Sequence, residues 1–160
     1  MTEVLRGFPP IIDAAASTLI LGSFPSEASL AAQQYYGHGQ NQFWRLLAAL
    51  LAIPLAEMAY PDRKAALHRA GVAVWDVFAS CQRAGSLDSA IRGAQANDFG
   101  KLKKLAPKLR RVCFNGQAAA RFAHHIEELG YETAVLPSSS PAYTLAFEKK
   151  LAAWRAVLGS

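Results

Sequence analysis

The pattern of apolar and polar residues predicts four short buried strands along the chain. Each is a mostly apolar run with a glycine, an asparagine or a proline at or next to one of its ends. Runs of this kind, without a regular polar alternation, are typical of strands covered on both faces of a parallel sheet. We expect these strands at residues 18–21, 71–77, 111–114 and 132–136.

Apolar residues at helical spacing predict helices between and after these strands. The clearest helix begins near Asn41, a good N-cap residue, carries an apolar stripe, and ends before Pro54. Ser26 is the expected N-cap of a shorter helix. That shorter helix covers residues 26–34. The other expected helices cover residues 61–71, 99–105, 119–129 and 147–158, and a short one covers residues 87–91 within an expected loop of residues 81–96.

Four strands that alternate with helices predict an α/β fold, because parallel strands need crossover connections that are usually helical. We expect a three-layer αβα arrangement with a central four-stranded parallel sheet, in a single domain of residues 1–160. The ends of these strands then bring polar, aromatic, glycine and proline residues to one edge of the sheet. These residues are 22–26, Trp75 with Asp76, Asn115 with Gly116, and 137–141. Ligands of open α/β sheets bind at this edge, so we expect the site there.

Composition narrows the class of protein. Apolar residues make up 52% of the 160 residues, and no stretch approaches the roughly 20 apolar residues that a membrane span needs. The first residues lack the apolar core of a signal peptide, so we expect a cytoplasmic protein. Cys81 and Cys113 have neither the spacing of a zinc site nor a disulfide framework, and we expect buried thiols.

The charge balance permits a polyanionic partner. Lys and Arg number 17 against 12 Asp and Glu, and the pI is near 9.4. Many basic proteins never bind nucleic acid, so the excess is compatible with DNA binding without showing it. The basic run of residues 101–111 is either a solvated surface or a contact for phosphates.

Several classes of chemistry lack their motifs. The chain has no GxGxxG after the first strand, no P-loop lysine motif and no GxSxG elbow. His124 and His125 lie in an apolar helical context without a second cluster of ligands, so no metal site is expected. The predicted edge instead gathers aromatic rings and amides, which suit a nucleobase, because rings stack on it and amides read its edge. Alternatively, these aromatic side chains belong to the hydrophobic core, and for Phe43 and Trp44 this is the better explanation.

Five segments occur in an order that resembles a known family. They are GSFPS, YYGHGQNQFW, GVAVWDV followed by GSLDSAI, FNG and LPSSSPA, and they extend from about Leu19 to about Tyr143. In this order they resemble the uracil-DNA glycosylase superfamily, and more narrowly its DNA-deoxyinosine (hypoxanthine-DNA) glycosylase branch. The resemblance implies the uracil-DNA glycosylase-like version of the αβα fold.

The resemblance also implies roles for individual residues. Phe24 stands where many relatives place the Asp or Asn that positions water, and this departure shifts the catalytic role to Asn41. Tyr36 matches the aromatic residue on which the extruded base stacks. Leu136 replaces the His that begins the second motif in the uracil branch. The implied base pocket is Gly22, Ser23, Phe24, Pro25, Tyr36, Trp75, Asp76 and Asn115, and the implied DNA contacts are Ser26, His38, Ser138, Ser139, Ser140 and Pro141.

Structural alternatives stay open for four of these residues. Asn41 is a possible helix N-cap, Asp76 a possible cap of the strand end, and Asn115 a possible turn residue before Gly116. Tyr36 could equally use its hydroxyl for a structural hydrogen bond at a loop edge.

The function implied by the resemblance is excision of a deaminated base from DNA. We expect a monomeric glycosylase that hydrolyses the N-glycosidic bond of deoxyinosine and leaves an abasic site. No lysine within the motifs is placed as a Schiff-base nucleophile, so a monofunctional enzyme without metal or cofactor is expected. The alternatives are excision of uracil or xanthine by the same fold, and a non-catalytic nucleotide-binding α/β module.

Overall fold

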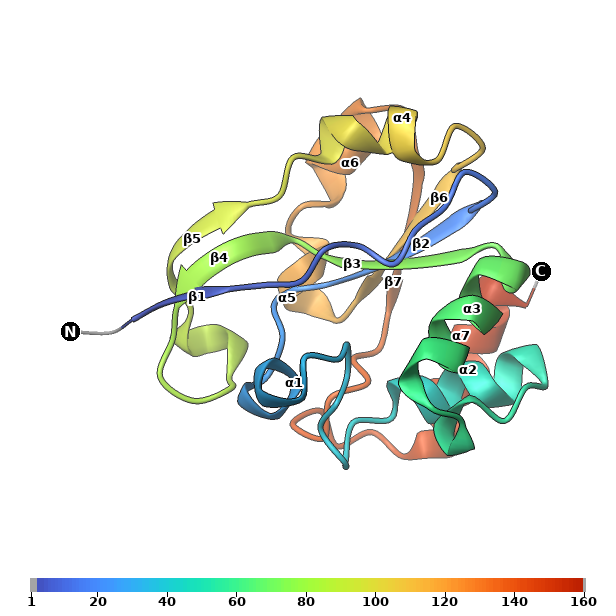
Figure 1. Ribbon diagram of the computed structural model, residues 1–160, viewed down its shortest axis with the longest axis horizontal. Coiled ribbons are helices and arrows are strands. Elements are labelled where there is room, and N and C mark those ends of the chain that lie inside the picture. The colour runs from blue at the N-terminus through green and yellow to red at the C-terminus, as the bar shows by residue number, and fades with distance from the viewer. Residues whose placement is uncertain (1–2, 160) are drawn as a thin grey trace.

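A parallel sheet of four strands runs through the centre of the molecule, whose residues 3–159 the computed structural model describes (Figure 1). The strands lie in the order β3-β2-β6-β7, and every neighbouring pair is parallel. They span Val72–Asp76 (β3), Thr18–Gly22 (β2), Arg111–Asn115 (β6) and Glu132–Leu136 (β7). The four predicted strands are therefore confirmed.

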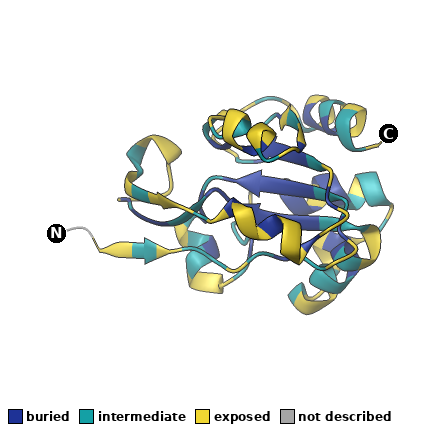
Figure 2. Cartoon of the chain, turned by 90° about the horizontal axis from the view of Figure 1, so that it is seen from above, coloured by how far each residue is buried: buried dark blue, intermediate teal, exposed yellow. Residues whose placement is uncertain are grey.

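Alternate residues of these strands face two separate cores, because successive side chains of a strand point to opposite faces. On β2, Ile20 belongs to one core, whereas Leu19 and Leu21 belong to the other. The Ile20 core is completed by helices α2 (Phe43–Leu51), α3 (Tyr60–Ala70) and α7 (Phe147–Leu158). The second is completed by α4 (Leu102–Leu105), α5 (Gln117–Ala120) and α6 (Ala123–Glu128). Figure 2 shows the buried strands between these layers, which confirms the three-layer αβα architecture.

A second sheet of three antiparallel strands extends from one side of the parallel sheet, and it was not predicted (Figure 1). Its order is β1-β4-β5, with strands Val4–Arg6 (β1), Phe78–Gln82 (β4) and Arg92–Ala96 (β5). The prediction of a loop over residues 81–96 was wrong, since residues 92–96 form strand β5. This strand has no apolar face that would reveal it in the sequence, and it is held by its pairing with β4. In place of the expected helix at 87–91 there is one 3-10 turn, Asp88–Ala90.

The helix boundaries depart from the sequence prediction at several places. The expected helix over 119–129 is divided into α5 and α6. Helix α2 begins at Phe43 and ends when Ala52 adopts the left-handed conformation, with φ at 54°, before Pro54 is reached. Ser26 is confirmed as the N-cap of α1 (Glu27–Ala32), because its hydroxyl accepts a hydrogen bond from Ser29 N. Two further 3-10 turns span Leu55–Glu57 and Phe99–Lys101.

Two expectations about the chain as a whole can be compared with the structure. Cys81 and Cys113 are both buried free thiols, as predicted. Within residues 3–159, no helix has the length and apolar character needed to cross a membrane.

Candidate functional site

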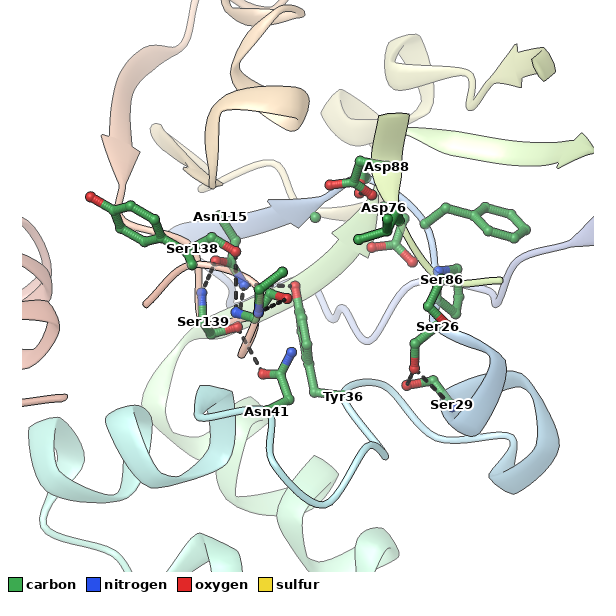
Figure 3. A pocket seen from close by; sticks show the side chains of 18 of the residues that line it. Ser26, Ser29, Tyr36, Asn41, Asp76, Ser86, Asp88, Asn115, Ser138 and Ser139 are labelled. Carbon is green, nitrogen blue, oxygen red and sulfur yellow. Dashed lines mark hydrogen bonds between the residues drawn. The ribbon is translucent and has the colours of Figure 1, made fainter. Parts of the chain in front are cut away.

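A cavity of about 340 Å³ opens at the carboxyl edge of the parallel sheet, where the sequence placed the site. It is formed by the loops that follow β2 and β7, by the last residues of β3 and β6, by the middle of the connection between β4 and β5, and by the segment between α1 and α2 (Figure 3). The volume lies within the range of small-molecule sites. Twelve predicted residues line it: Gly22, Ser23, Phe24, Pro25, Ser26, Tyr36, Asn41, Asp76, Asn115, Ser138, Ser139 and Ser140.

Three predicted residues do not line this cavity. Trp75 precedes Asp76 on β3 and therefore points to the opposite face of the sheet, where it packs edge-on against Phe99 at 5.5 Å. Its placement in the pocket was wrong for this reason. His38 uses Nδ1 to accept a hydrogen bond from Gln40 N, and Pro141 is exposed, although Ser140 and Ala142 on either side of it line the cavity.

The side-chain oxygen of Asn41 is fully engaged by two donors. Its Oδ1 accepts hydrogen bonds from Ser139 Oγ at 2.8 Å and from Phe43 N at 3.0 Å. The second of these satisfies a free N–H at the start of α2, but the N-cap residue of this helix is Gln42, so the predicted N-cap position of Asn41 was wrong by one residue. Because the oxygen is occupied, only the amide nitrogen is left for a ligand in the cavity (Figure 3). Asn41 can therefore donate hydrogen bonds to a ligand but is not placed to accept a proton.

A hydrogen-bond network fixes this orientation of Asn41. Asn115 Nδ2 donates to Ser139 Oγ at 2.9 Å, and Asn115 Oδ1 accepts from Ser139 N at 2.9 Å. Since the Ser139 hydroxyl accepts from Asn115, its own proton is directed to Asn41. The backbone completes the link, because Gln42 N donates to Ser139 O at 3.0 Å. The loop after β7 and the start of α2 are thus held together beneath the cavity.

The ring of Tyr36 is held rigidly at the cavity wall. It stacks on Phe43 with 3.9 Å between ring centroids and 17° between planes, and its hydroxyl accepts from Asn115 Nδ2 at 3.2 Å. Its backbone is left-handed, with φ at 54°, which is uncommon for a bulky residue and indicates a constrained position. Burial, and secondly the charge of Asp76, raises the pKa of Tyr36, so the phenol stays neutral.

Asp76 is a buried carboxyl group that faces the cavity and is only 4% exposed. Burial raises its pKa to about 7, the nearby charge of Asp88 adds to this increase, and Arg83 opposes it. Among the described residues, its Oδ2 atom has no hydrogen-bond partner. An unsatisfied buried oxygen at a cavity wall is a candidate contact for a ligand.

The sequence interpretation missed several residues of the cavity wall, among them Ser29, Tyr35, Ala142 and Tyr143. Ser86, Leu87, Asp88 and Ser89, in the segment between β4 and β5, also line the cavity. The GSLDSAI segment that contains them contributed to the family resemblance, but no role was assigned to it. Their position depends on the unpredicted antiparallel sheet, whose hairpin returns the chain to the edge of the cavity.

Comparisons with known proteins agree with one another. The family model described as the Uracil DNA glycosylase superfamily matches residues 9–158. A protein named hypoxanthine DNA glycosylase from Methanosarcina acetivorans is 43% identical over 154 residues, which cover 96% of this chain and 98% of that protein. A protein of the same name from Methanosarcina barkeri is 40% identical over 149 residues, covering 93% and 94%. The solution NMR structure of a candidate uracil DNA glycosylase from Methanosarcina acetivorans matches with a TM-score of 0.89 and 42% identity, covering 97% of this chain and 96% of that one.

Proposed function

The chain belongs to the uracil DNA glycosylase superfamily, and we propose that it is a monofunctional DNA N-glycosylase that removes hypoxanthine from deoxyinosine. The observation that carries the proposal is the amide of Asn41, whose oxygen is occupied and whose nitrogen is left to donate into a cavity lined by aromatic and polar groups. The names of the two relatives favour hypoxanthine over other deaminated bases.

The reaction begins with extrusion of the damaged nucleotide from the duplex. Extrusion costs a few kcal/mol, and less for a mispaired base, which favours a deaminated base over a normal one. We propose that the base stacks on Tyr36, which is already immobilised against Phe43, and that Phe24 forms the opposite wall. Ser26, His38, Ser138, Ser140 and Pro141 are proposed to contact the DNA backbone around the cavity. The DNA contact predicted for Ser139 is not proposed again, because this side chain is only 1% exposed and its hydroxyl is bonded to Asn115 and Asn41.

Catalysis then depends on donors that meet the charge of the departing base. As the N-glycosidic bond breaks, positive charge develops on the sugar and negative charge on the purine. Water then forms the new bond to the sugar carbon, and the proton that it loses neutralises the purine. The Asn41 amide, together with the backbone N–H groups of Ser23 and Phe24, is proposed to stabilise that negative charge. Donors held in place before the reaction are effective because they need no reorganisation.

A panel of DNA duplexes tests the proposed function. Purified protein is incubated with duplexes that contain one deoxyinosine, deoxyuridine or deoxyxanthosine, and strand breaks are measured before and after alkali. We expect alkali-dependent breaks with deoxyinosine and intact strands before alkali, as a monofunctional glycosylase requires. Preferred cleavage of another base would reassign the substrate. No cleavage of any duplex would instead favour a non-catalytic nucleotide-binding module.

Removing the ring of Tyr36 is expected to weaken base binding. Stacking on an aromatic side chain contributes about 1–3 kcal/mol per base, so Tyr36→Ala should raise the KM for deoxyinosine duplexes by about tenfold or more. Tyr36→Phe is the matched control, because it keeps the ring and loses only the hydroxyl that accepts from Asn115. Equal losses in both variants would show that the hydroxyl is what counts, and would contradict stacking.

Asp76 is expected to make excision depend on pH near neutrality. Hypoxanthine carries N1–H and O6 side by side, and a neutral carboxyl group offers one acceptor and one donor to match them. Because burial and Asp88 raise the pKa of Asp76 to about 7, this neutral form is lost as pH rises. If only the neutral form is active, the single-turnover rate should fall about tenfold from pH 6 to pH 8.

Asp76→Asn is the control for this pH dependence. The carboxamide keeps a donor and an acceptor at every pH, so the decline between pH 6 and pH 8 should disappear. Stability offers a second measurement, because the pKa of Asp76 lies above its ordinary value of 3.8 in the folded chain. The folded protein then binds a proton between about pH 4 and 7 that the unfolded chain has lost, so the free energy of unfolding should fall as pH rises through this window. If Asp76→Asn changes neither the pH dependence of the excision rate nor that of the free energy of unfolding, Asp76 does not read the base in its neutral form.

A further inference from the structure

Lys150, on α7, carries a buried charge that the proposed reaction does not use. Its side chain is only 1% exposed, and none of the ion pairs within residues 3–159 includes it. A cation without a carboxylate partner is costly to bury, and an apolar residue of similar volume is often at least as stabilising. The fold alone therefore does not explain why a lysine stands at this position, and its contacts indicate another role.

Both contacts of the Lys150 ammonium lie in the loop that follows β7. Nζ donates to Ser140 O at 3.2 Å and lies 5.4 Å from the centre of the Tyr143 ring. Ser140 O also accepts from Tyr143 N at 3.1 Å, so the ammonium is bound to the carbonyl that closes this turn. One helical turn further on, Trp154 Nε1 donates to Pro137 O at 2.9 Å. Residues four apart share one face of a helix, so this face of α7 holds the loop at two points.

The loop that Lys150 holds also carries the residue that orients the amide of Asn41. Ser139 precedes Ser140, donates to Asn41 Oδ1 at 2.8 Å and accepts from Asn115 Nδ2 at 2.9 Å. A displacement of the Ser140 carbonyl moves the backbone of Ser139, because one peptide unit joins the two residues. The Lys150 ammonium is thus separated from the proposed catalytic amide by one carbonyl and one serine.

We propose that Lys150 is a positioning residue for excision, an inference that rests on the proposed glycosylase function. Its ammonium fixes the Ser140 carbonyl, and thereby keeps the Ser139 hydroxyl directed at Asn41. The ammonium is covered by the protein, so it does not contact a DNA phosphate. Removing it should therefore change the rate of the chemical step and leave the binding of DNA unchanged.

Lys150→Met tests this role, because methionine fills the buried space without a donor or a charge. The single-turnover rate at saturating deoxyinosine duplex should fall about tenfold, less than the 10²-fold that a misplacement of about 1 Å can cost. The Kd for the same duplex should stay within about twofold of the wild type, as expected when a substitution affects the transition state alone. The free energy of unfolding should stay equal or rise, because an unpaired buried cation has been removed.

Lys149→Met is the matched control for the loss of one positive charge. Lys149 is the preceding residue of α7, but its side chain is exposed and has no contact with the loop after β7 among the described residues. This variant should keep the rate, the Kd and the stability of the wild type.

A double-mutant cycle shows whether Lys150 acts through Ser139. Ser139→Ala removes the hydroxyl that donates to Asn41, so the amide is no longer oriented by the loop. Adding Lys150→Met to Ser139→Ala should lower the rate less than twofold further, since coupled residues do not have additive effects. Two independent losses that multiply would overturn the inference.

Amide hydrogen exchange makes the inference testable without cleavage. Ser139 N donates to Asn115 Oδ1, and Gln42 N donates to Ser139 O, so both amides report the position of the loop. Both should exchange faster in Lys150→Met than in Lys149→Met. If the wild type fails to cleave any duplex, the proposed function is refuted, and the exchange rates still show whether Lys150 fixes the loop.

Three further results would overturn the inference. The first is a Lys150→Met protein with the rate and the exchange of the wild type. The second is a raised Kd with an unchanged rate at saturation, which would make Lys150 a contact for DNA. The third is a Lys150→Met chain that does not fold, which would make Lys150 a support of the fold.

Discussion

Replacing Asn41 by alanine is expected to lower the single-turnover rate of hypoxanthine excision by about 10²–10³-fold, the usual effect of removing one preorganised donor. The amide nitrogen is the part that matters, because the oxygen is already bonded to Ser139 Oγ and Phe43 N. Binding of deoxyinosine DNA should change little, since the donor meets a charge that develops only as the bond breaks. Single-turnover rates and equilibrium binding to the same duplex measure the two effects separately.

Asn41→Asp distinguishes catalysis from helix capping. Aspartate keeps an oxygen for Ser139 Oγ and Phe43 N and is a good residue at a helix start, so the free energy of unfolding should stay near that of the wild type. It has no donor for the cavity, so excision should be lost as in Asn41→Ala. The alanine variant should also lose about 1 kcal/mol of stability. An aspartate variant of full activity, or an alanine variant that is active but less stable, would leave Asn41 as a cap alone.

The parallel sheet could be predicted from the sequence because each of its strands is a nearly continuous apolar run. Strand β2 buries four of its five residues, so its pattern was visible without any knowledge of its neighbours. Strand β5, with the sequence RGAQA, buries none and forms only through its pairing with β4. A long-range pairing of polar residues leaves no periodic signal, which is why the second sheet and the cavity-lining residues 86–89 were missed.

The residues that line the site could be predicted from the sequence better than the hydrogen bonds that join them. The strand ends identified Gly22, Asp76 and Asn115, because parallel strands deliver their carboxyl ends to one edge. The bond from Ser139 to Asn41 joins residues 98 positions apart, and no local pattern reveals it. Trp75 was wrongly placed in the pocket for another reason. The end of β3 brings both Trp75 and Asp76 to the sheet edge, but only Asp76 faces the cavity.

Gly22→Ala is expected to lower the rate of excision by about 10²-fold although the methyl group carries no chemistry. A Cβ atom at this position would lie 2.7 Å from Asp76 Oδ1 and 2.7 Å from Tyr36 Oη, closer than real Cβ atoms approach other atoms. Tyr36 cannot withdraw freely, because it stacks on Phe43 and its hydroxyl accepts from Asn115. The stacking ring and the base-reading carboxyl must therefore shift, and a displacement of about 1 Å can reduce a rate by 10²-fold.

Gly39→Ala is the matched control, because a Cβ atom there has no neighbour within 4 Å. Both substitutions reduce the freedom of the unfolded chain similarly, so the difference between them isolates the contacts at Gly22. The free energy of unfolding should fall by about 1–3 kcal/mol more in Gly22→Ala than in Gly39→Ala, as overpacking usually causes. Denaturant unfolding and single-turnover rates measure both effects. A Gly22→Ala protein that excises hypoxanthine at the rate of Gly39→Ala would mean that Tyr36 and Asp76 need not hold the positions they have, and the stacking and base-reading roles proposed for them would fall together.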